Sequence, residues 1–129
     1  MSQTSPTVRI EKQGGAEEMH LVDLPVGDPG PGEIRIRHHA CGLVRTDIHI
    51  VKGGFPRTPF PITPGHESAG EIVELGQGVS GLSVGDRVGI DAGLSCGQCE
   101  FCRGGSSNVC PHRGGIGGTV NGGFAELAV

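Results

Sequence analysis

The strongest constraint on how this chain can fold is a cluster of cysteines. Four of its five cysteines fall within fifteen residues, as Cys96-x-x-Cys99-x-x-Cys102 followed by Cys110. Four thiolates at this spacing can surround one Zn²⁺ ion tetrahedrally. An odd total of cysteines does not suit a disulfide framework, and in an intracellular chain such a cluster is typical of metal binding. We therefore expect a lobe over about 91–113 that folds around zinc.

The spacing alone leaves two other interpretations of the cluster open. An iron–sulfur cluster uses a similar triple spacing, usually with proline directly after the last cysteine, as Pro111 follows Cys110 here. Disulfides or free thiols are the remaining interpretation. If the metal is zinc, four sulfurs leave no position for water, so the ion is expected to be structural rather than catalytic. The fifth cysteine, Cys41, is interpreted as a small, buried apolar residue.

Short segments of alternating apolar and polar residues indicate a mainly β fold. They lie at 7–11, 33–40 (where Ile34 and Ile36 alternate with Arg35 and Arg37), 70–75 and 87–90. Clusters drawn from 25 glycines and 9 prolines separate them, at intervals typical of barrels and sandwiches. At this length we expect one domain, 1–129, with a single core.

One segment has helical periodicity. Over 45–52 we predict a short helix that ends at Gly53-Gly54. Its apolar face is expected to carry Leu43, Val44, Ile48 and Val51. In the strand at 33–40, His38 and His39 should point to opposite sides, which is poor geometry for a shared metal, so neither is given a role.

Charge and hydropathy exclude several classes of function. The net charge is -4 and the cations are scattered, so no basic face indicates a nucleic-acid partner. No stretch approaches the ~20 apolar residues of a membrane-spanning helix, and the first residues lack the apolar core of a signal peptide. We therefore expect a cytoplasmic protein without a membrane partner.

The glycines of Gly76-x-Gly78-x-x-Gly81 spell a dinucleotide-binding fingerprint after a strand-like segment. That fingerprint requires a helix directly after the loop, because the helix N-terminus binds the pyrophosphate. Here Gly85 and Asp86 follow without helical periodicity. We therefore reject cofactor binding at this loop.

Several motifs occur together in one order. They are Gly42-Leu43-Val44-Arg45-Thr46-Asp47, Pro64-Gly65-His66-Glu67, Gly85-Asp86-Arg87-Val88, the four clustered cysteines and Asn121-Gly122-Gly123-Phe124-Ala125-Glu126. Over nearly the whole chain this set resembles the zinc-dependent medium-chain alcohol and polyol dehydrogenases. The resemblance implies a GroES-like barrel, the N-terminal catalytic domain of an enzyme that interconverts small alcohols and aldehydes with NAD or NADP. It also favours zinc at the four cysteines.

The resemblance implies a catalytic zinc position, with one departure. His66 matches a family histidine that binds this zinc, and Glu67 matches a carboxylate beside it. The residue where the family has a ligand cysteine is Val44, which cannot coordinate a metal. Cys41 lies three positions earlier, and a different backbone path would be needed for it to substitute.

Four further residues receive roles from the resemblance. Thr46 matches the hydroxyl that contacts the substrate oxygen, Asp47 the carboxylate behind the ligand histidine, and His49 the end of a proton relay. Arg45 matches a residue that often contacts cofactor phosphate. Each also has an ordinary explanation: Thr46 as a helix N-cap, Asp47 as an acid in the first turn, and Arg45 and His49 as solvated side chains.

The cofactor-binding Rossmann domain of the family, with a further catalytic-zinc ligand, lies beyond the last residue of this sequence. We therefore expect a zinc-binding GroES-like domain that is inactive alone, since hydride transfer needs a cofactor held against the substrate. One alternative is a non-catalytic, zinc-stabilised binding or assembly module. The other is half of a split dehydrogenase with a separate Rossmann-domain partner. A homo-oligomer is compatible with each.

Overall fold

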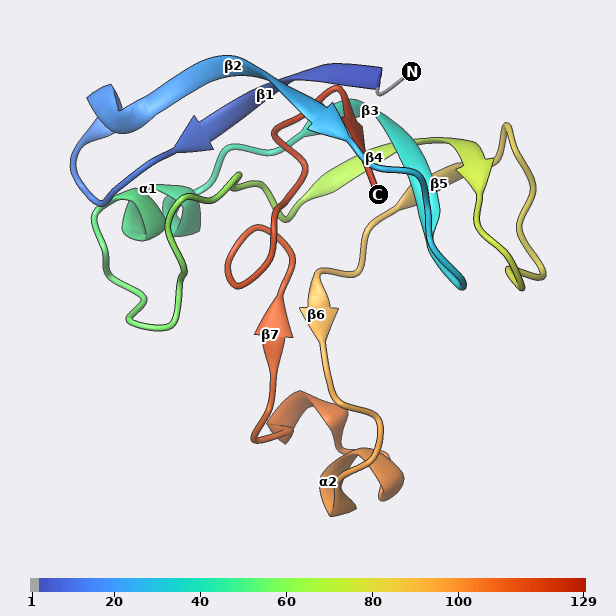
Figure 1. Cartoon of the computed structure of the whole chain (residues 1–129). Coiled ribbons are helices and arrows are strands. Elements are labelled where there is room, and N and C mark those ends of the chain that lie inside the picture. The colour runs from blue at the N-terminus through green and yellow to red at the C-terminus, as the bar shows by residue number, and fades with distance from the viewer. Residues whose placement is uncertain (1–2) are drawn as a thin grey trace.

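The computed structural model describes residues 3–129, and two layers of strands form its barrel (Figure 1). Strand β1 (Gln3–Ile10) pairs antiparallel with β2 (Met19–Val26), and the short 3-10 helix η1 (Ala16–Glu18) lies between them. The second sheet is antiparallel, in the order β5-β4-β3-β8. Its strands are β3 (Ile34–Cys41), β4 (Ser68–Leu75), β5 (Arg87–Gly89) and β8 (Leu127–Ala128).

Backbone contacts close the barrel between the two sheets. The Val8 amide donates to the Phe124 carbonyl at 2.7 Å, and Thr7 forms an antiparallel bridge with Ala125. Ile10 and Ile62 exchange two hydrogen bonds of 2.8 and 2.9 Å. These contacts join the first strand to the segments that come before β4 and β8.

Helix α1 (Arg45–Val51) covers one end of the barrel and confirms the predicted helix. Ile50 and Val51 pack into a core cluster with Ile10 and Ile62. The predicted apolar face is correct for buried Val51 and wrong for Leu43 and Ile48, which are 69% and 48% exposed, while Asp47 is completely buried. In a helix only two turns long, contact with the barrel decides which positions are buried. One of the buried positions of α1 is occupied by the carboxylate of Asp47.

Strand β3 departs from strict alternation at Arg35. Alternation of apolar and polar residues predicts an exposed side chain here, but Arg35 is only 7% exposed, next to buried Ile36. The Arg35 guanidinium donates to the Gly27 carbonyl at 2.6 Å, so the loop after β2 covers this side chain. The guanidinium pairs with Glu74, and also with Asp28 at 3.0 Å, so its charge is compensated.

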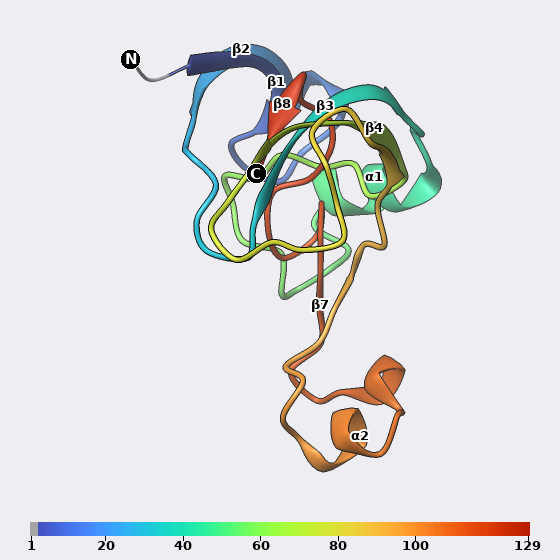
Figure 2. The same ribbon diagram turned by 90° about the vertical axis from the view of Figure 1, so that its right-hand side faces the viewer.

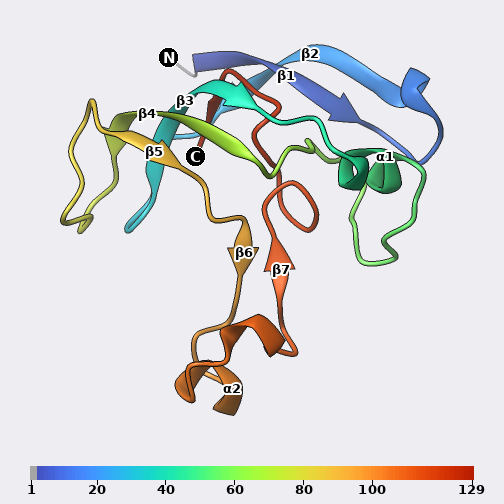
Figure 3. The same cartoon turned by 180° about the vertical axis from the view of Figure 1, so that it is seen from behind.

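A small lobe projects from the barrel on a two-stranded stalk, as two views show (Figures 1 and 2). The stalk is β6 (Gly93–Leu94) paired with β7 (Gly114–Gly115). Between them lie α2 (Glu100–Arg103) and the 3-10 helix η2 (Ser107–Val109). From behind, α1 and the loop joining β4 to β5 lie at opposite ends of the barrel, with the lobe below (Figure 3).

The predicted mainly β class is confirmed, and each of the four predicted strands is present within a few residues of its expected bounds. Strand β2 was not predicted. The glycine fingerprint lies in the loop between β4 and β5, and no helix follows it within the described residues, as predicted. Among residues 3–129, no helix is long and apolar enough to cross a membrane.

Candidate functional site

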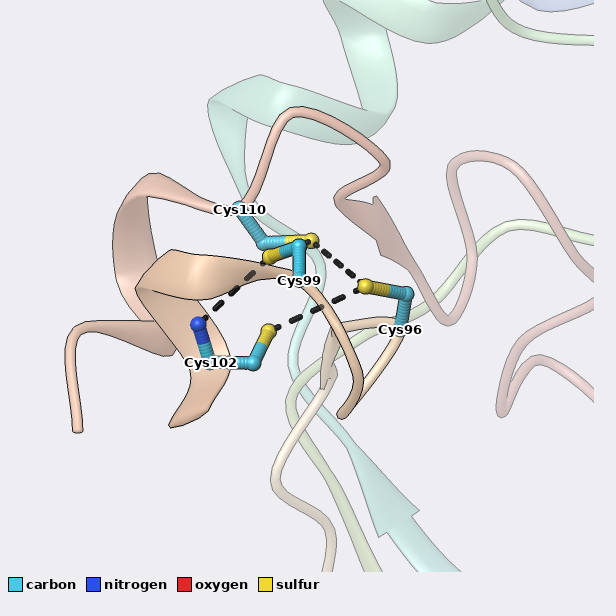
Figure 4. A group of neighbouring side chains, drawn as sticks. All are labelled: Cys96, Cys99, Cys102 and Cys110. Atoms are coloured by element: carbon cyan, nitrogen blue, oxygen red, sulfur yellow. Dashed lines mark hydrogen bonds between the residues drawn. The ribbon is translucent and has the colours of Figure 1, made fainter. Parts of the chain in front are cut away.

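The four clustered cysteines converge in the lobe, with all ligand sulfurs within 4.8 Å of one another (Figure 4). Cys96 Sγ lies 4.0 Å from Cys102 Sγ and 3.6 Å from Cys110 Sγ, and Cys99 Sγ lies 3.9 Å from Cys110 Sγ. Tetrahedral zinc with Zn–S bonds of about 2.3 Å separates its sulfurs by about 3.8 Å. The cluster therefore fits one zinc ion.

This geometry bears on the other two interpretations. All five cysteines are free thiols, which excludes disulfides in this structure. In an iron–sulfur cluster the cysteines bind different irons and sit around the outside of the cluster, so their sulfurs must lie farther apart than around one ion. The observed spacing favours a single ion.

Local backbone structure positions the sulfurs. Cys99 is the N-cap of α2, and its Sγ accepts a hydrogen bond from the Cys102 amide at 3.5 Å. Cys110 follows η2 and is the only buried residue of the segment 95–113. The apolar residues Phe101 and Val109 are 41% and 53% exposed. The lobe thus has no apolar core of its own.

The cysteines do not lose their protons evenly. Backbone amides of Gln98 and Cys99 donate to Cys96 and lower its pKa to about 6. The Cys102 amide also acts to lower the pKa of Cys99, but desolvation and the neighbouring sulfurs outweigh it and raise that pKa to about 11. A divalent cation is needed before all four can bind as thiolates.

A cavity of about 530 Å³ lies where α1, the loop after it and the segment following the lobe meet. Thr46 from α1 and His66 from the loop before β4 both line it. Its volume is in the range of small-molecule sites. The structure thus brings together two of the residues selected from the sequence. The rest of the wall is formed by Ile50, Phe55, Arg57, Thr58, Ala92, Gly93 and the segment 113–119.

Asp47 lies buried behind this cavity. Its Oδ2 accepts the Val44 amide at 2.9 Å, and its Oδ1 accepts the Gly65 amide at 3.3 Å. Nδ1 of His66 lies 3.9 Å from the same Oδ1, an ion-pair distance rather than a hydrogen bond. The carboxylate therefore ties the start of α1 to the loop that carries His66.

Comparison with known proteins decides the family. A sequence profile described as the alcohol dehydrogenase GroES-like domain matches residues 30–129. The chain belongs to this family. The fold and resemblance expected from the sequence are thereby confirmed, and the chain is the GroES-like domain of a zinc-dependent alcohol dehydrogenase architecture.

Individual relatives agree with this assignment. The domain is 39% identical to a sorbitol dehydrogenase of Halalkalibacterium halodurans, over 93% of the chain and 35% of the relative. It is 45% identical to an alcohol dehydrogenase of Geobacillus stearothermophilus, over 74% and 29%. A zinc-binding dehydrogenase homologue from Sinorhizobium meliloti, solved with NADP, superimposes with a TM-score of 0.90 at 35% identity, covering 98% and 36%. The chain spans about a third of the length of these relatives.

The remaining predicted residues of the GroES-like domain lie outside the cavity wall. Arg45 and His49 are exposed on α1, and the His49 ring meets the edge of Phe55 with centroids 6.4 Å apart. Phe55 does line the cavity, so His49 stands just behind its rim. Glu67 is exposed, and its backbone carbonyl accepts the Gly42 amide at 2.9 Å.

A catalytic zinc does not fit the described residues around His66. Val44 is the N-cap of α1 and offers no ligand atom. Cys41 does not line the cavity, and burial, followed by the charge of Asp47, raises the pKa of its thiol. Within residues 3–129, the cysteine lobe is the only group of three or more potential ligands that converge. The family's second zinc site is therefore not built by these residues.

Sequence reasoning missed several residues of the cavity wall. Phe55, Arg57 and Arg113 line it, but no local pattern marks them, because they meet only in the folded chain. The glycines in and before the motif around Asn121 did indicate a close backbone contact. A side chain at Gly122 would overlap the Gly65 carbonyl, and one at Gly117 would lie 2.6 Å from the same oxygen. The glycines thus let the segment after the lobe pack against the His66 loop.

Proposed function

We propose that this GroES-like domain is the substrate-side part of an NAD(P)-linked alcohol or polyol dehydrogenase. The observation that carries the proposal is the convergence of Thr46 and His66, from two separate elements, on one cavity of small-molecule size. The dehydrogenase names of the relatives support the same class of reaction. On this proposal the domain acts in the cytoplasm, together with a nicotinamide cofactor that the parent enzyme binds.

We further propose that zinc in the lobe has a structural role. Four sulfurs close the coordination sphere, so no water or substrate can reach the ion. The lobe buries almost no apolar surface, so metal binding would supply its folding free energy. The lobe would then span about 91–113 and position the segment that returns to the cavity wall.

The proposed roles around the cavity follow from position. The Thr46 hydroxyl would bond the substrate oxygen inside the cavity. His49 lies three residues later on the same helix, hence on a neighbouring position of its surface, and would pass the proton to solvent. Asp47 would orient His66, and Arg45, exposed at the start of α1, would face the cofactor phosphate. A nicotinamide cofactor, when bound by the parent, would accept the hydride.

Val44 favours a second candidate function. Because the described residues do not build a catalytic zinc site, no step of the reaction is assigned to such an ion. The domain could instead be a zinc-stabilised binding or assembly module, either as a homo-oligomer or with a separate Rossmann-domain partner. The two candidates differ in whether the cavity recognises alcohols.

The experiment is a titration of the zinc-loaded domain with glycerol, followed by amide NMR. If the proposal is right, signals of Thr46, His66 and the 114–119 segment shift together, and Thr46→Val weakens binding about tenfold through loss of one hydrogen bond. Thr4→Val, on the exposed face of β1, is the matched control and should bind as the parent does. Absence of shifts at the cavity would support the assembly module.

A further inference from the structure

Two arginines from different parts of the chain line the same cavity as Thr46 and His66. Arg57 comes from the loop after α1, and Arg113 immediately precedes β7. We propose that the cavity selects alcohols or aldehydes that carry a phosphate or carboxylate group, which Arg57 and Arg113 bind. This proposal rests on the function above and deepens it by naming the substrate class.

The charge of the cavity wall is one-sided. The lining contains two guanidinium groups, and none of its residues is an aspartate or glutamate. The net charge of the whole chain is -4, so the cavity wall has the opposite sign of charge to the chain as a whole. Clefts lined by one sign of charge concentrate ligands of the opposite sign. A neutral polyol lacks the charge attraction that a phosphate or carboxylate gains from such a wall.

Neither guanidinium forms a salt bridge with a carboxylate of the described residues. In the part of the chain that the structure describes, no carboxylate lies within 4.0 Å of Arg57 or Arg113. By contrast, buried Arg35 has two acidic partners. Arg113 Nη1 donates to the Asn108 carbonyl at 2.9 Å, which steadies the side chain and leaves its other donors free. Planar guanidinium donors match the two oxygens of a carboxylate or phosphate.

The rest of the wall fits a small molecule with an alcohol at one end and an anion at the other. Ile50, Phe55 and Ile116 provide apolar surface for a short carbon chain. Thr58 adds a hydroxyl that could bond a further polar group, whereas the Thr119 hydroxyl is already bonded to the Gly115 backbone. Thr46 would receive the reacting oxygen, as proposed above.

The anionic group could belong to the substrate or to the cofactor, since both can carry phosphate. Arg45, the residue assigned to cofactor phosphate, does not line this cavity. The two sources therefore predict different responses. A substrate site should bind a small phosphorylated alcohol by itself, whereas a cofactor site should prefer the intact dinucleotide.

The test compares ligands on the zinc-loaded domain by amide NMR and calorimetry. The probes are glycerol, glycerol 3-phosphate, inorganic phosphate and NADP. We expect glycerol 3-phosphate to bind at least about tenfold more tightly than glycerol, with shifts at 57–58 and 113–119, and with affinity falling as salt is added. Arg57→Gln and Arg113→Gln should each remove most of that difference.

Arg37→Gln, on the exposed face of β3, is the matched control and should bind both ligands as the parent does. Because Arg113 also bonds Asn108, zinc content is measured in its variant, and Arg57→Gln provides the independent test.

Equal affinity for glycerol and glycerol 3-phosphate would overturn this proposal while the proposed function stands. Cavity shifts with NADP but none with glycerol 3-phosphate would assign the arginines to the cofactor and also overturn it. If none of the probes shifts the cavity signals, both the proposed function and this inference are wrong.

Discussion

Oδ1 of Asp47 lies 3.9 Å from Nδ1 of His66, on a carboxylate that is completely buried. The same carboxylate accepts the Val44 and Gly65 amides, so a single side chain holds the start of α1 against the loop that carries His66. Asp47 is therefore a positioning residue that fixes two walls of the cavity relative to each other.

Replacing Asp47 should destabilise the fold. Asp47→Ala removes the acceptor of the buried Gly65 amide and of the half-buried Val44 amide, and a buried unsatisfied donor costs about 1–3 kcal/mol. We expect the free energy of unfolding, measured in urea, to fall by about 2–4 kcal/mol. Asp23→Ala, at an exposed position of β2, should change it by less than about 0.5 kcal/mol. Equal stability of the two variants would show that the carboxylate does not hold these elements together.

Removing one thiolate should release the metal and loosen only the lobe. We expect Cys99→Ser to lose most of its zinc by elemental analysis and to lose amide protection over 95–113, while the barrel strands keep theirs. Cys41→Ser, in β3, should retain one equivalent. Full zinc content in the Cys99 variant would contradict the four-sulfur site.

His38 predicts how stability depends on pH. Burial lowers the pKa of this histidine, although its contact with the Ala125 carbonyl at 2.9 Å acts the other way. A lowered folded pKa means that this stabilisation is present above the unfolded pKa of about 6.5 and is lost as the pH falls below it. We expect unfolding free energy to decrease between about pH 7 and about pH 5, and to decrease less in His38→Gln.

The control for this measurement is His39→Gln, because His39 is exposed on the other side of the same strand. It should reproduce the pH profile of the parent. If His38→Gln and His39→Gln give identical profiles, burial of His38 does not contribute.

The close contact of Gly122 with Gly65 can be tested by one methyl group. Gly122→Ala would place Cβ against the Gly65 carbonyl and 2.7 Å from the Pro64 carbonyl, and backbone on both sides leaves little room to adjust. We expect a loss of about 1–3 kcal/mol in unfolding free energy, measured by thermal or urea denaturation. Gly89→Ala in β5, where an added Cβ meets nothing within 4 Å, should be nearly neutral. Similar losses in both variants would argue against the close packing.

Local sequence patterns predicted the elements that follow local rules. The alternating strands, the helix at 45–52 and the convergence of four cysteines were all accessible, because periodicity and ligand spacing act over short distances. Strand β2 was missed, since Pro25 interrupts an otherwise alternating segment at the edge of its sheet. The burial of Arg35 depends on Glu74, 39 residues away, which no local window contains.

Some residues of the candidate site could be predicted from local motifs, and others could not. Motifs identified Thr46, Asp47 and His66 before the fold was known. Arg57 and Arg113 are separated by 56 positions and meet only because the lobe returns the chain to the barrel. Tertiary contacts of this kind have no periodic signature.

The stalk gives zinc an influence beyond the lobe. Only two residue pairs, Gly93 with Gly115 and Leu94 with Gly114, join β6 to β7, and the glycines of these pairs line the cavity. A molecule that loses its metal would therefore keep a folded barrel but lose the ordered cavity wall, and with it affinity for a ligand. We expect the exposed stretch between Leu94 and Gly114 to be cleaved faster by proteases in the metal-free protein than in the zinc-loaded one.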